Sequence, residues 1–310
     1  MTAACTRSND FEELGEALRA FPLSVRSNVD SVQYTTFAIG GPLRHLVEVQ
    51  TKEELCEAMR LFGEFGVTPH VLGFGSNLLL PDGGISGWVL KLGKGFRYNH
   101  AERGATFRIG GASALMTLSR EFSAAGLSGL EFAGGIPASL GGAVRMNAGA
   151  HGGEISEVLE EVTVVDLGGQ QKTYRKDELS FSYRKTSLLP TEVVYEARFS
   201  LVESDKESTT ARRAECLAAR KATQPLSMPS AGSVFKNPKD SELSAGALIE
   251  QTGLKGHSIG GAQVSELHAN WIINPRRDAT SQNVKDLIAL CQNKVQDQFG
   301  IDLDPEIVRW

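Results

Sequence analysis

The first chemistry that this sequence offers lies in the backbone of a glycine-rich segment, residues 129–154. Glycine pairs at 134–135, 141–142 and 152–153 lie around one proline, Pro137. Glycine reaches positive φ and leaves backbone N–H groups accessible to a ligand, a surface suited to pyrophosphate and planar rings. The segment therefore predicts a nucleotide cofactor.

A second glycine loop, Gly73-Phe-Gly-Ser-Asn77, follows a predicted strand. It does not match the dinucleotide fingerprint G-x-G-x-x-G, which fails at Leu78, and the sequence has no G-x-x-x-x-G-K-[ST] phosphate loop. On its own the loop is explained equally well as a turn. Two backbone-lined loops closing on one dinucleotide favour the ligand interpretation.

Two short segments carry side chains that suit catalysis. Residues 183–187, Tyr-Arg-Lys-Thr-Ser, place two cations after a short strand, although surface cations are usually only solvated. Residues 229–238, Pro-Ser-Ala-Gly-Ser-Val-Phe-Lys-Asn-Pro, set Ser233 beside a glycine and near Lys236. A serine in these surroundings fits a buried core poorly, and a capped turn is the alternative to a reactive site.

Length and composition limit the function classes. With 310 residues the chain exceeds the usual domain size of roughly 100–200 residues, so two or three domains are expected. Its 33 glycines exceed the roughly 22 expected at about 7% usage, which suggests loops shaped around ligands. The net charge of −5 and the pI near 5.8 argue against nonspecific nucleic-acid binding, which needs a basic stripe.

The cysteines and histidines indicate neither disulfides nor a metal. The four cysteines are far apart and form no Cys-x-x-Cys pair, which fits a reducing cytoplasm: Cys5, Cys56, Cys216 and Cys291. Three histidines lack metal-ligand spacing: His151, His257 and His268. No signal peptide and no apolar run of about 18 residues is found, so a soluble protein without a membrane span is expected. No His-Glu-x-x-His motif supports a zinc hydrolase.

Periodicity gives the elements that must position these residues. A short helix is predicted over 11–23 and a strand over 43–49. Thr51 and Glu54 predict a capping box at the start of a helix, and 68–72 reads as a buried strand. Strands near 88–92 and 105–109 and a helix over 114–125 precede the glycine-rich segment.

The second half of the sequence changes character after residue 202. Strands at 161–167 and 171–175 flank Gly168-Gly169 as a hairpin, and 192–202 alternates as a strand that closes the cofactor domain. Residues 203–222 predict a helical connection to another domain. That domain contains helices over 244–251, stopped by Gly253, and 284–299, stopped by Gly300, and a terminal strand over 301–308.

The chain resembles the UDP-N-acetylenolpyruvoylglucosamine reductases from about Ser24 to its C-terminus. Six motifs occur in the family's order: Thr36-Phe-Ala-Ile-Gly-Gly41, Leu72-Gly-Phe-Gly-Ser-Asn-Leu78, Ala133-Gly-Gly-Ile-Pro137 with Gly-Gly-Ala-Val-Arg-Met-Asn-Ala-Gly149, Ser182-Tyr-Arg-Lys185, Ala231-Gly-Ser-Val-Phe-Lys-Asn-Pro238 and Pro305-Glu-Ile307. The segment between Tyr183 and Tyr195 is short, as in the subclass that lacks a Tyr-bearing insertion. Residues 1–23 lie outside the resemblance.

The resemblance implies an α+β fold with noncovalent FAD, and NADPH as co-substrate. It implies an FAD-binding domain of the vanillyl-alcohol-oxidase (PCMH) type over 24–203, in two lobes at about 24–92 and 93–203. An N-terminal extension (1–23), a smaller α+β substrate domain (204–300) and a C-terminal strand (301–310) complete the division. The implied activity is reduction of the enolpyruvyl ether of UDP-N-acetylglucosamine enolpyruvate, giving UDP-N-acetylmuramate for peptidoglycan.

The resemblance also implies the site residues. Arg184 would hold the substrate carboxylate, Ser233 would donate a proton, and Glu306 would help to polarise the intermediate. A serine is a weak acid, so Ser233 would need a nearby cation such as Lys236. The implied FAD contacts are Gly40, Gly73, Phe74, Gly75, Ser76, Asn77, Gly134, Gly135, Ile136, Pro137, Ser139, Gly141, Gly142, Asn147 and Gly149. The implied substrate contacts are Tyr183, Arg184, Gln224, Lys236 and Asn237.

Two residues depart from the family's pattern, and two other classes of function remain as alternatives to the reductase. Ala138 stands where the family commonly has Gly, and His151 where it commonly has Tyr, so flavin packing is in question there. A carbohydrate oxidase of the same fold would attach its flavin to a His or Cys, for which His151 is the candidate in a glycine-rich loop. A non-catalytic binding module could lose the three catalytic residues, yet all are present. The expected partners are the UDP-sugar and NADPH, with no nucleic acid and no membrane, and the expected state is a monomer.

Overall fold

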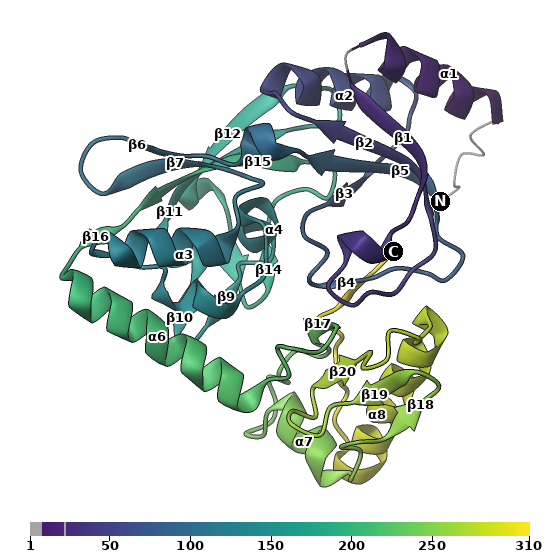
Figure 1. Ribbon diagram of the computed structural model, residues 1–310, viewed down its shortest axis with the longest axis vertical. Helices are drawn as coiled ribbons and strands as arrows, with labels where there is room; N and C mark the ends of the chain where they lie inside the picture. The colour runs from purple at the N-terminus through teal and green to yellow at the C-terminus, as the bar shows by residue number, and fades with distance from the viewer. Residues whose placement is uncertain (1–7, 22) are drawn as a thin grey trace. The chain divides into compact units, whose positions relative to one another are not determined.

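The chain folds into two units, each assembled from separate stretches of sequence. The computed structural model describes residues 8–21 and 23–310. The first unit takes residues 1–27, 44–73 and 87–216, and the second takes 28–43, 74–86 and 217–310. Helices and mostly antiparallel sheets occur in both units, in agreement with the predicted α+β class (Figure 1).

The first unit contains a four-stranded sheet covered by two helices. Its strand order is β1 (Ser24–Val29), β2 (Leu43–Val49), β5 (Ile85–Leu92) and β3 (His70–Leu72), with β3 parallel to β5. Helices α1 (Ser8–Ala20) and α2 (Lys52–Glu64) pack against each other and bury Leu14, Leu18, Leu55 and Phe62 over this sheet (Figure 1). The predicted strand 43–49 is confirmed, and the predicted N-terminal helix is confirmed over most of its length. Pro22, its predicted end, lies outside the described residues.

Two local predictions in this region need correction. Thr51 caps α2 by accepting from the Glu54 N–H, as predicted, but the Glu54 carboxylate accepts from the Gln50 N–H (2.6 Å) and not from Thr51. The predicted buried strand 68–72 is shorter, because only His70–Leu72 pair with β5. It is not fully buried either, since Val71 is 39% exposed.

A five-stranded antiparallel sheet forms the rest of the first unit's framework. Its order is β12 (Gln171–Arg175), β11 (Leu159–Val165), β15 (Val193–Ser200), β7 (Thr106–Gly110) and β6 (Asn99–Ala101). The strands predicted near 105–109, 161–167, 171–175 and 192–202 are thereby confirmed. Helices α3 (Leu115–Ala124) and α4 (Leu140–Arg145) share a buried core with this sheet, in which Ile109, Val162, Val194 and Phe199 take part.

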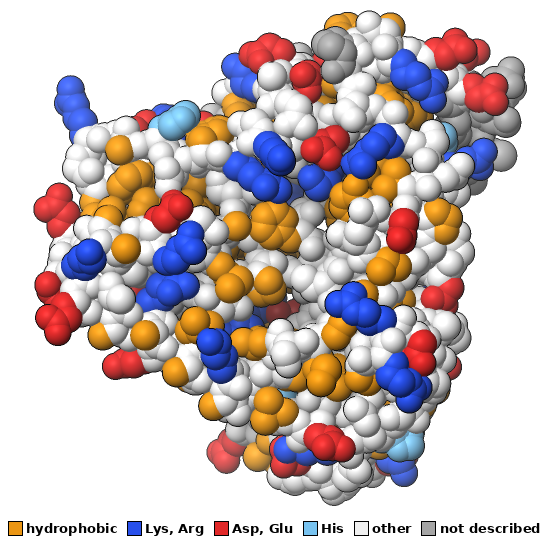
Figure 2. Space-filling view, in the orientation of Figure 1, with side chains coloured by type: hydrophobic (Ala, Val, Ile, Leu, Met, Phe, Trp, Pro, Cys, Tyr) orange, Lys and Arg blue, Asp and Glu red, His pale blue; other side chains and the backbone are white. Residues whose placement is uncertain are grey.

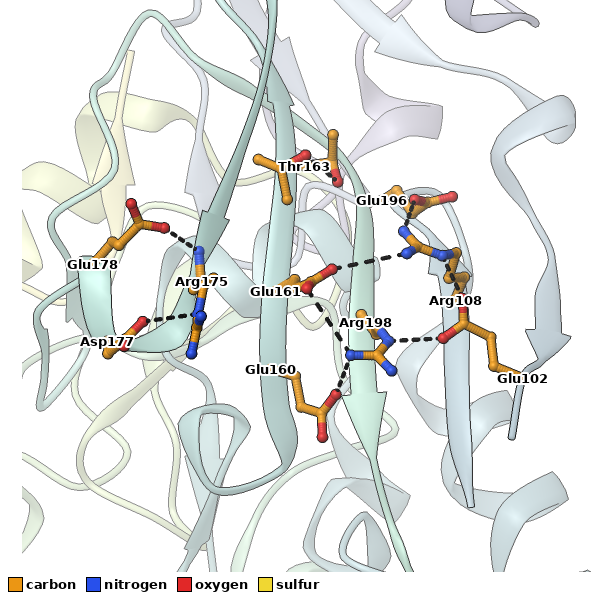
Figure 3. A network of polar contacts seen from close by, with 11 residues as sticks. Glu102, Arg108, Glu160, Glu161, Thr163, Arg175, Asp177, Glu178, Glu196 and Arg198 are labelled. Carbon is orange, nitrogen blue, oxygen red and sulfur yellow. Dashed lines mark hydrogen bonds and ion pairs between the residues drawn. The ribbon is translucent and has the colours of Figure 1, made fainter. Parts of the chain in front are cut away.

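Charged side chains form a network on the same sheet. Arg108 on β7 contacts Glu102 (2.5 Å) and Glu196 (3.1 Å), and Arg198 on β15 contacts Glu102 (2.7 Å) and Glu160 (2.6 Å) (Figure 3). Hydrogen bonds from Arg198 and Arg108 lower the pKa of Glu102, with Arg198 contributing more. These pairs link three neighbouring strands and the turn after β6.

The first unit also contains several smaller elements, two of them within the glycine-rich segment. Three two-stranded pairs are formed by β8 (Leu127–Ser128) with β16 (Val202–Glu203), β9 (Gly149–Ala150) with β10 (Gly153–Glu154), and β13 (Phe181–Ser182) with β14 (Lys185–Thr186). Helix α5 covers Ile155–Val158. Helix α6 (Lys206–Thr223) confirms the predicted helical connection.

The second unit has its own sheet and core. Its strand order is β17 (Ser230–Ser233), β20 (Trp271–Ile273), β19 (Ala262–Val264) and β18 (Ser258–Ile259). Helices α7 (Ala245–Gln251) and α8 (Ser281–Phe299) confirm the two predicted helices. Gly253 and Gly300 follow them at φ 75° and 68°. Both helices contribute to one buried core, which includes Leu248, Val284 and Leu287.

The predicted strand over 301–308 is wrong for most of its length. Only β21 (Val308–Arg309) is a strand, and it pairs in parallel with β4 (Leu78–Leu79). Residues 301–307 are held by single contacts, including a bridge between Pro305 and Phe235. The short partners available to this segment explain why a local pattern overestimated its length.

Candidate active site

The glycine-rich segment folds as a series of tight turns around the helix α4. Residues 131–135 form one 3₁₀ turn, and Ser139 caps α4 by accepting from the Gly142 N–H (3.4 Å). A Cβ at Gly141 would lie 2.8 Å from the Val194 carbonyl oxygen, so glycine lets this helix approach strand β15. Gly142 is exposed, and a Cβ there would meet only Ser139 Oγ at 3.3 Å. Close packing against β15 therefore requires glycine at position 141 but not at position 142.

The charge and exposure of this segment bear on the predicted dinucleotide. Residues 134–149 contain no carboxylate, and Pro137 and Gly142 are exposed. The one cation, Arg145, donates to the Leu188 and Glu192 carbonyls, and burial lowers its pKa. Arg145 is therefore occupied inside the protein. The N–H groups of Ile136, Ala138, Gly141 and Gly142 also donate to protein acceptors, so the segment offers a close, uncharged surface rather than a row of free donors.

The first glycine of the second loop meets the glycine-rich segment. A Cβ at Gly73 would lie 2.5 Å from Ser139 Oγ, so these two predicted FAD contacts are neighbours within the first unit. Gly75 belongs to the second unit, has φ +61°, and a Cβ there would lie 2.2 Å from the Tyr34 carbonyl oxygen. Glycine at position 75 is thus required by its own conformation and by a neighbouring chain segment.

Asn77 ties the same loop to the C-terminal segment. Its Nδ2 donates to the Glu306 carbonyl (3.1 Å), and its own carbonyl accepts from the Val308 N–H (3.0 Å). A residue predicted to contact FAD therefore lies directly against the predicted catalytic residue Glu306. In the same unit, the predicted contact Gly40 has φ +136°, and a Cβ there would crowd Leu80 and Ser31.

Arg184 occupies the turn of a small hairpin in the first unit. Phe181 pairs with Thr186 and Ser182 with Lys185, which leaves Tyr183 and Arg184 as the two turn residues. Arg184 has φ +58°, a conformation that side chains other than Asn and Asp rarely adopt. Its guanidinium carbon lies 5.0 Å from the Tyr183 ring centre, and Tyr183 is 46% exposed.

Asn147 connects this hairpin to the glycine-rich segment. Its Nδ2 donates to the Ser182 carbonyl (3.4 Å), and its Oδ1 accepts from the Ser156 N–H (3.0 Å). Asn147 is fully buried and has φ +42°, so both ends of its amide are used within the unit. Hydrogen bonds from Ser156 and then Asn147 lower the pKa of Glu154, and the charge of Arg184 lowers it further.

Ser233 ends the strand β17 at a bulge. Ser230 pairs with Ile273 and Ser233 with Trp271, so three steps on β17 face two on β20. Gly232, at φ +78°, takes up the extra residue. Ser233 is half-buried, while Val234 and Phe235, which follow it, are 2% and 1% exposed.

Glu306 lies beside the Ser233 segment. Its N–H donates to the Val234 carbonyl (2.8 Å), and the Lys236 N–H donates to the Asp304 carbonyl (2.9 Å). The structure therefore brings Ser233 and Glu306 to adjacent chain segments of the second unit. The Lys236 ammonium pairs with the Asp304 carboxylate (2.7 Å). This pairing partly neutralises the positive charge that was expected to support Ser233.

Two further predicted substrate contacts, Asn237 and Gln224, already make hydrogen bonds within the second unit. Asn237 Oδ1 accepts from the Ala245 N–H (3.1 Å), and Gln224 Oε1 accepts from Arg220 Nε (2.8 Å). Three catalytic predictions are thus distributed over both units, Arg184 in the first and Ser233 with Glu306 in the second.

Sequence reasoning missed two buried asparagines at the ends of β20. Asn270 and Asn274 are 4% and 0% exposed. Asn270 binds the main chain of Phe235, and Asn274 Nδ2 donates to the Phe37 carbonyl (3.2 Å). The available signal was an asparagine at each end of an apolar run, Asn-Trp-Ile-Ile-Asn, because a buried amide needs specific partners.

The surface and the remaining reactive groups add little to the site. Blue and red side chains are interspersed among hydrophobic and uncharged ones on the face drawn in Figure 2. Cys56, Cys216 and Cys291 are free thiols, and Cys5 lies outside the described residues. Across residues 8–21 and 23–310, no helix combines the length and the apolar character needed to span a membrane.

Comparison with known proteins covers both units. Residues 224–310 match the C-terminal domain of UDP-N-acetylenolpyruvoylglucosamine reductase, and residues 43–174 match the FAD binding domain family. UDP-N-acetylenolpyruvoylglucosamine reductase 2 of Symbiobacterium thermophilum is 41% identical over 301 residues, 96% of each chain. The reductase of Heliobacterium modesticaldum is 44% identical over 276 residues, 89% of this chain and 87% of that protein.

A solved structure shows the same relationship. The crystal structure of UDP-N-acetylenolpyruvylglucosamine reductase from Thermus caldophilus superposes with a TM-score of 0.79 at 38% identity. The match covers 93% of this chain and 98% of that one.

Proposed function

Because the chain belongs to the UDP-N-acetylenolpyruvoylglucosamine reductase family, we propose that Arg184, Ser233 and Glu306 perform its reaction. That reaction is the NADPH-dependent reduction of the enolpyruvyl ether of UDP-N-acetylglucosamine enolpyruvate to UDP-N-acetylmuramate, a step of peptidoglycan precursor synthesis. FAD, when bound, carries the hydride from NADPH to the substrate. Both ligands need the same flavin, so NADPH reacts and leaves before the UDP-sugar binds.

Arg184 serves the substrate carboxylate. Addition of hydride to the vinyl methylene carbon makes an enolate-like species next to that carboxylate, and a permanent cation stabilises it. A guanidinium offers a planar pair of donors that matches a carboxylate. The position of Arg184 at a hairpin turn, with Tyr183 beside it, supports this role.

Ser233 and Glu306 serve the carbon that carries the ether oxygen. Ser233 donates the proton to that carbon, and Glu306 assists in polarising the intermediate. The contact between the Glu306 N–H and the Val234 carbonyl (2.8 Å) is the observation that carries this proposal, because it places the two residues on neighbouring segments. Both lie within the part of the chain that matches the reductase C-terminal domain.

The binding residues follow the same division. Residues 24–203 supply most of the FAD contacts, through the backbone of the glycine-rich segment and the loop 73–77. Residues 204–300 hold the UDP-sugar, with Gln224, Lys236 and Asn237 as contacts, and 301–310 bring Glu306. Tyr183 adds a contact from the Arg184 turn. We propose that the enzyme works in the cytoplasm, where its nucleotide ligands occur. We also propose that it is a monomer.

The Ser233→Ala variant tests the proposed proton donor. Reduction of the bound flavin by NADPH needs no acid for a substrate carbon, so it should keep its normal rate. Reoxidation by UDP-N-acetylglucosamine enolpyruvate should slow by about 10²–10⁴-fold, the usual effect of losing a general acid. Rapid-mixing absorbance at the flavin band, without oxygen, measures both steps. Equal slowing of both steps, or of neither, would show that another group donates the proton.

A further inference from the structure

Asn270 has no place in the proposed chemistry, yet all of its polar groups are hydrogen-bonded, three of the four to the residues that follow Ser233. Its Oδ1 accepts from the Phe235 N–H (2.9 Å), and its Nδ2 donates to the Phe235 carbonyl (2.8 Å). Its carbonyl accepts from the Val234 N–H (2.9 Å), and its own N–H donates to His268 Nδ1 (3.2 Å). The residue is 4% exposed, so it makes these bonds away from solvent.

These bonds continue the sheet where its main-chain pairing stops. The last paired residues of β17 and β20 are Ser233 and Trp271, just after the bulge at Gly232. Beyond them the side-chain amide of Asn270 takes the place of a strand, because it binds both the N–H and the C=O of one residue, Phe235. On this edge the main chain of Phe235 is therefore fixed by a side chain rather than by a neighbouring strand.

The opposite edge of the same short segment carries Glu306. The Val234 carbonyl accepts from the Glu306 N–H (2.8 Å), and Phe235 forms a bridge with Pro305. Residues 233–236 thus lie between Asn270 on one edge and residues 304–306 on the other. A displacement of Phe235 would shift Ser233 and Glu306 together.

We infer that Asn270 is a positioning residue for proton donation, which holds Ser233 and Glu306 in register with each other. This inference rests on the proposed roles of Ser233 and Glu306. Asn270 itself is not among the proposed substrate or cofactor contacts. Removing its amide should let the Ser233 hydroxyl leave its productive position, and misplacement of about 1 Å can cost roughly 10²-fold in rate.

A double-mutant cycle tests the inference. Asn270→Ala should leave flavin reduction by NADPH unchanged and slow reoxidation by UDP-N-acetylglucosamine enolpyruvate by about 10²-fold. In the Ser233→Ala background the same change should cause no further slowing, because the group that it positions is gone. Asn270→Asp, which keeps the shape but sets a carboxylate oxygen against the Phe235 carbonyl oxygen, should slow reoxidation at least as much.

Asn283→Ala is the matched control for loss of a structural amide. Asn283 lies in the same unit, and its Oδ1 accepts from the N–H groups of Thr280 (3.1 Å) and Gly261 (3.3 Å). Its loss should lower the unfolding temperature and leave both flavin steps at their normal rates. Slowing of reoxidation by Asn283→Ala to the same degree as by Asn270→Ala would overturn a specific role for Asn270.

The outcomes separate the two proposals. Equal slowing by Asn270→Ala with and without Ser233 overturns the positioning role and leaves the role of Ser233 intact. A Ser233→Ala variant with normal reoxidation overturns both. Amide hydrogen exchange of the unaltered protein gives a test without any variant: the Phe235 amide should exchange as slowly as that of Val234. Rapid exchange at Phe235 alone would show that the Asn270 bond does not form.

Discussion

The Arg184 hairpin and the Ser233 segment are both short, but they are held in different ways. Arg184 stands in a two-residue turn at positive φ, and its hairpin is tied to the preceding chain by Asn147 (3.4 Å) and by the Thr186 hydroxyl, which donates to the Arg145 carbonyl (3.1 Å). The segment after Ser233 is hydrogen-bonded along both edges and contains two buried residues, Val234 and Phe235.

This difference matches what the two proposed roles demand. A cation attracts a carboxylate over a range of distances, so a residue in a turn can perform that task. Proton transfer needs donor and acceptor within hydrogen-bond reach, so the acid benefits from a fixed backbone. Changes at Arg184 should therefore affect substrate binding as well as rate, whereas changes around Ser233 should affect mainly the rate.

Among the variants considered below, Arg184→Ala should slow the reaction most. Reoxidation by the enolpyruvyl substrate should slow by about 10²–10³-fold, the usual effect of removing one group that stabilises a developing negative charge. The apparent affinity for that substrate should also fall, because the cation contacts the ground state. Substrate titrations in the rapid-mixing experiment measure both quantities.

Two further substitutions separate the charge from the geometry at this position. Arg184→Lys keeps the cation and loses the planar pair of donors, so its effect should be intermediate. Arg184→Gly should match Arg184→Ala in rate and be the more stable, since glycine tolerates φ +58°. A normal substrate affinity in Arg184→Ala would show that the guanidinium does not bind the carboxylate.

One glycine in each unit is tightly packed, so the two units can be compared by the same substitution. Alanine at Gly141 in the first unit, or at Gly75 in the second, would place a Cβ 2.8 Å from the Val194 carbonyl or 2.2 Å from the Tyr34 carbonyl. Each should lower the free energy of unfolding by about 1–3 kcal/mol, as overpacking does. Chemical denaturation of the flavin-free protein measures this loss, and the absorbance ratio of the purified protein gives its FAD content.

Neighbouring glycines with more space are the controls for these two variants. A Cβ at Gly83 would meet nothing within 4 Å, and one at Gly142 would meet only Ser139 Oγ at 3.3 Å. Both alanine variants should keep the stability of the flavin-free protein. If Gly142→Ala also loses FAD, the cofactor lies against the start of α4. If Gly141→Ala keeps full stability, the close contact with β15 does not constrain this helix.

Much of the fold could be predicted because the signals are local. The cap at Thr51 and the helix-ending Gly253 and Gly300 each depend on a few neighbouring residues. Helix α2 begins after Thr51, and helices α7 and α8 end at or just before those glycines, as predicted. Strand lengths at 68–72 and 301–308 were wrong because they depend on a distant partner strand. Likewise, no local pattern assigns residues 28–43 and 74–86 to the same unit as the C-terminal region.

The candidate site divides in the same way. The glycine loops and Ser233 attract attention through their own neighbours in sequence. Glu306 has no such signal and depended on the resemblance to a family. Asn270 was missed because its importance lies in bonds to Phe235, which is 35 residues away in the chain.

The charged network on the five-stranded sheet should give the smallest effect, and it shows what a purely structural contact contributes. Glu102 accepts from both Arg108 and Arg198, and these hydrogen bonds hold its pKa below the ordinary value near 4.3. A carboxylate whose pKa is lower in the folded state stabilises the fold above its unfolded pKa, and this contribution is lost as the pH falls through the folded pKa. Exposure to solvent keeps the contribution small.

Glu102→Gln should therefore lower the thermal unfolding midpoint slightly at pH 7, and the difference from the unaltered protein should vanish in acid. Added salt should also reduce the difference, because it screens exposed charges. Glu160→Gln, which removes a carboxylate paired with Arg198 (2.6 Å) and not with Arg108, should have a smaller effect. Neither substitution should change flavin reduction or reoxidation, since these carboxylates pair with arginines of the sheet and have no proposed contact with substrate or flavin. A slower reoxidation in Glu102→Gln would mean that the network influences catalysis, and the contrast between structural and catalytic charges in this enzyme would fail.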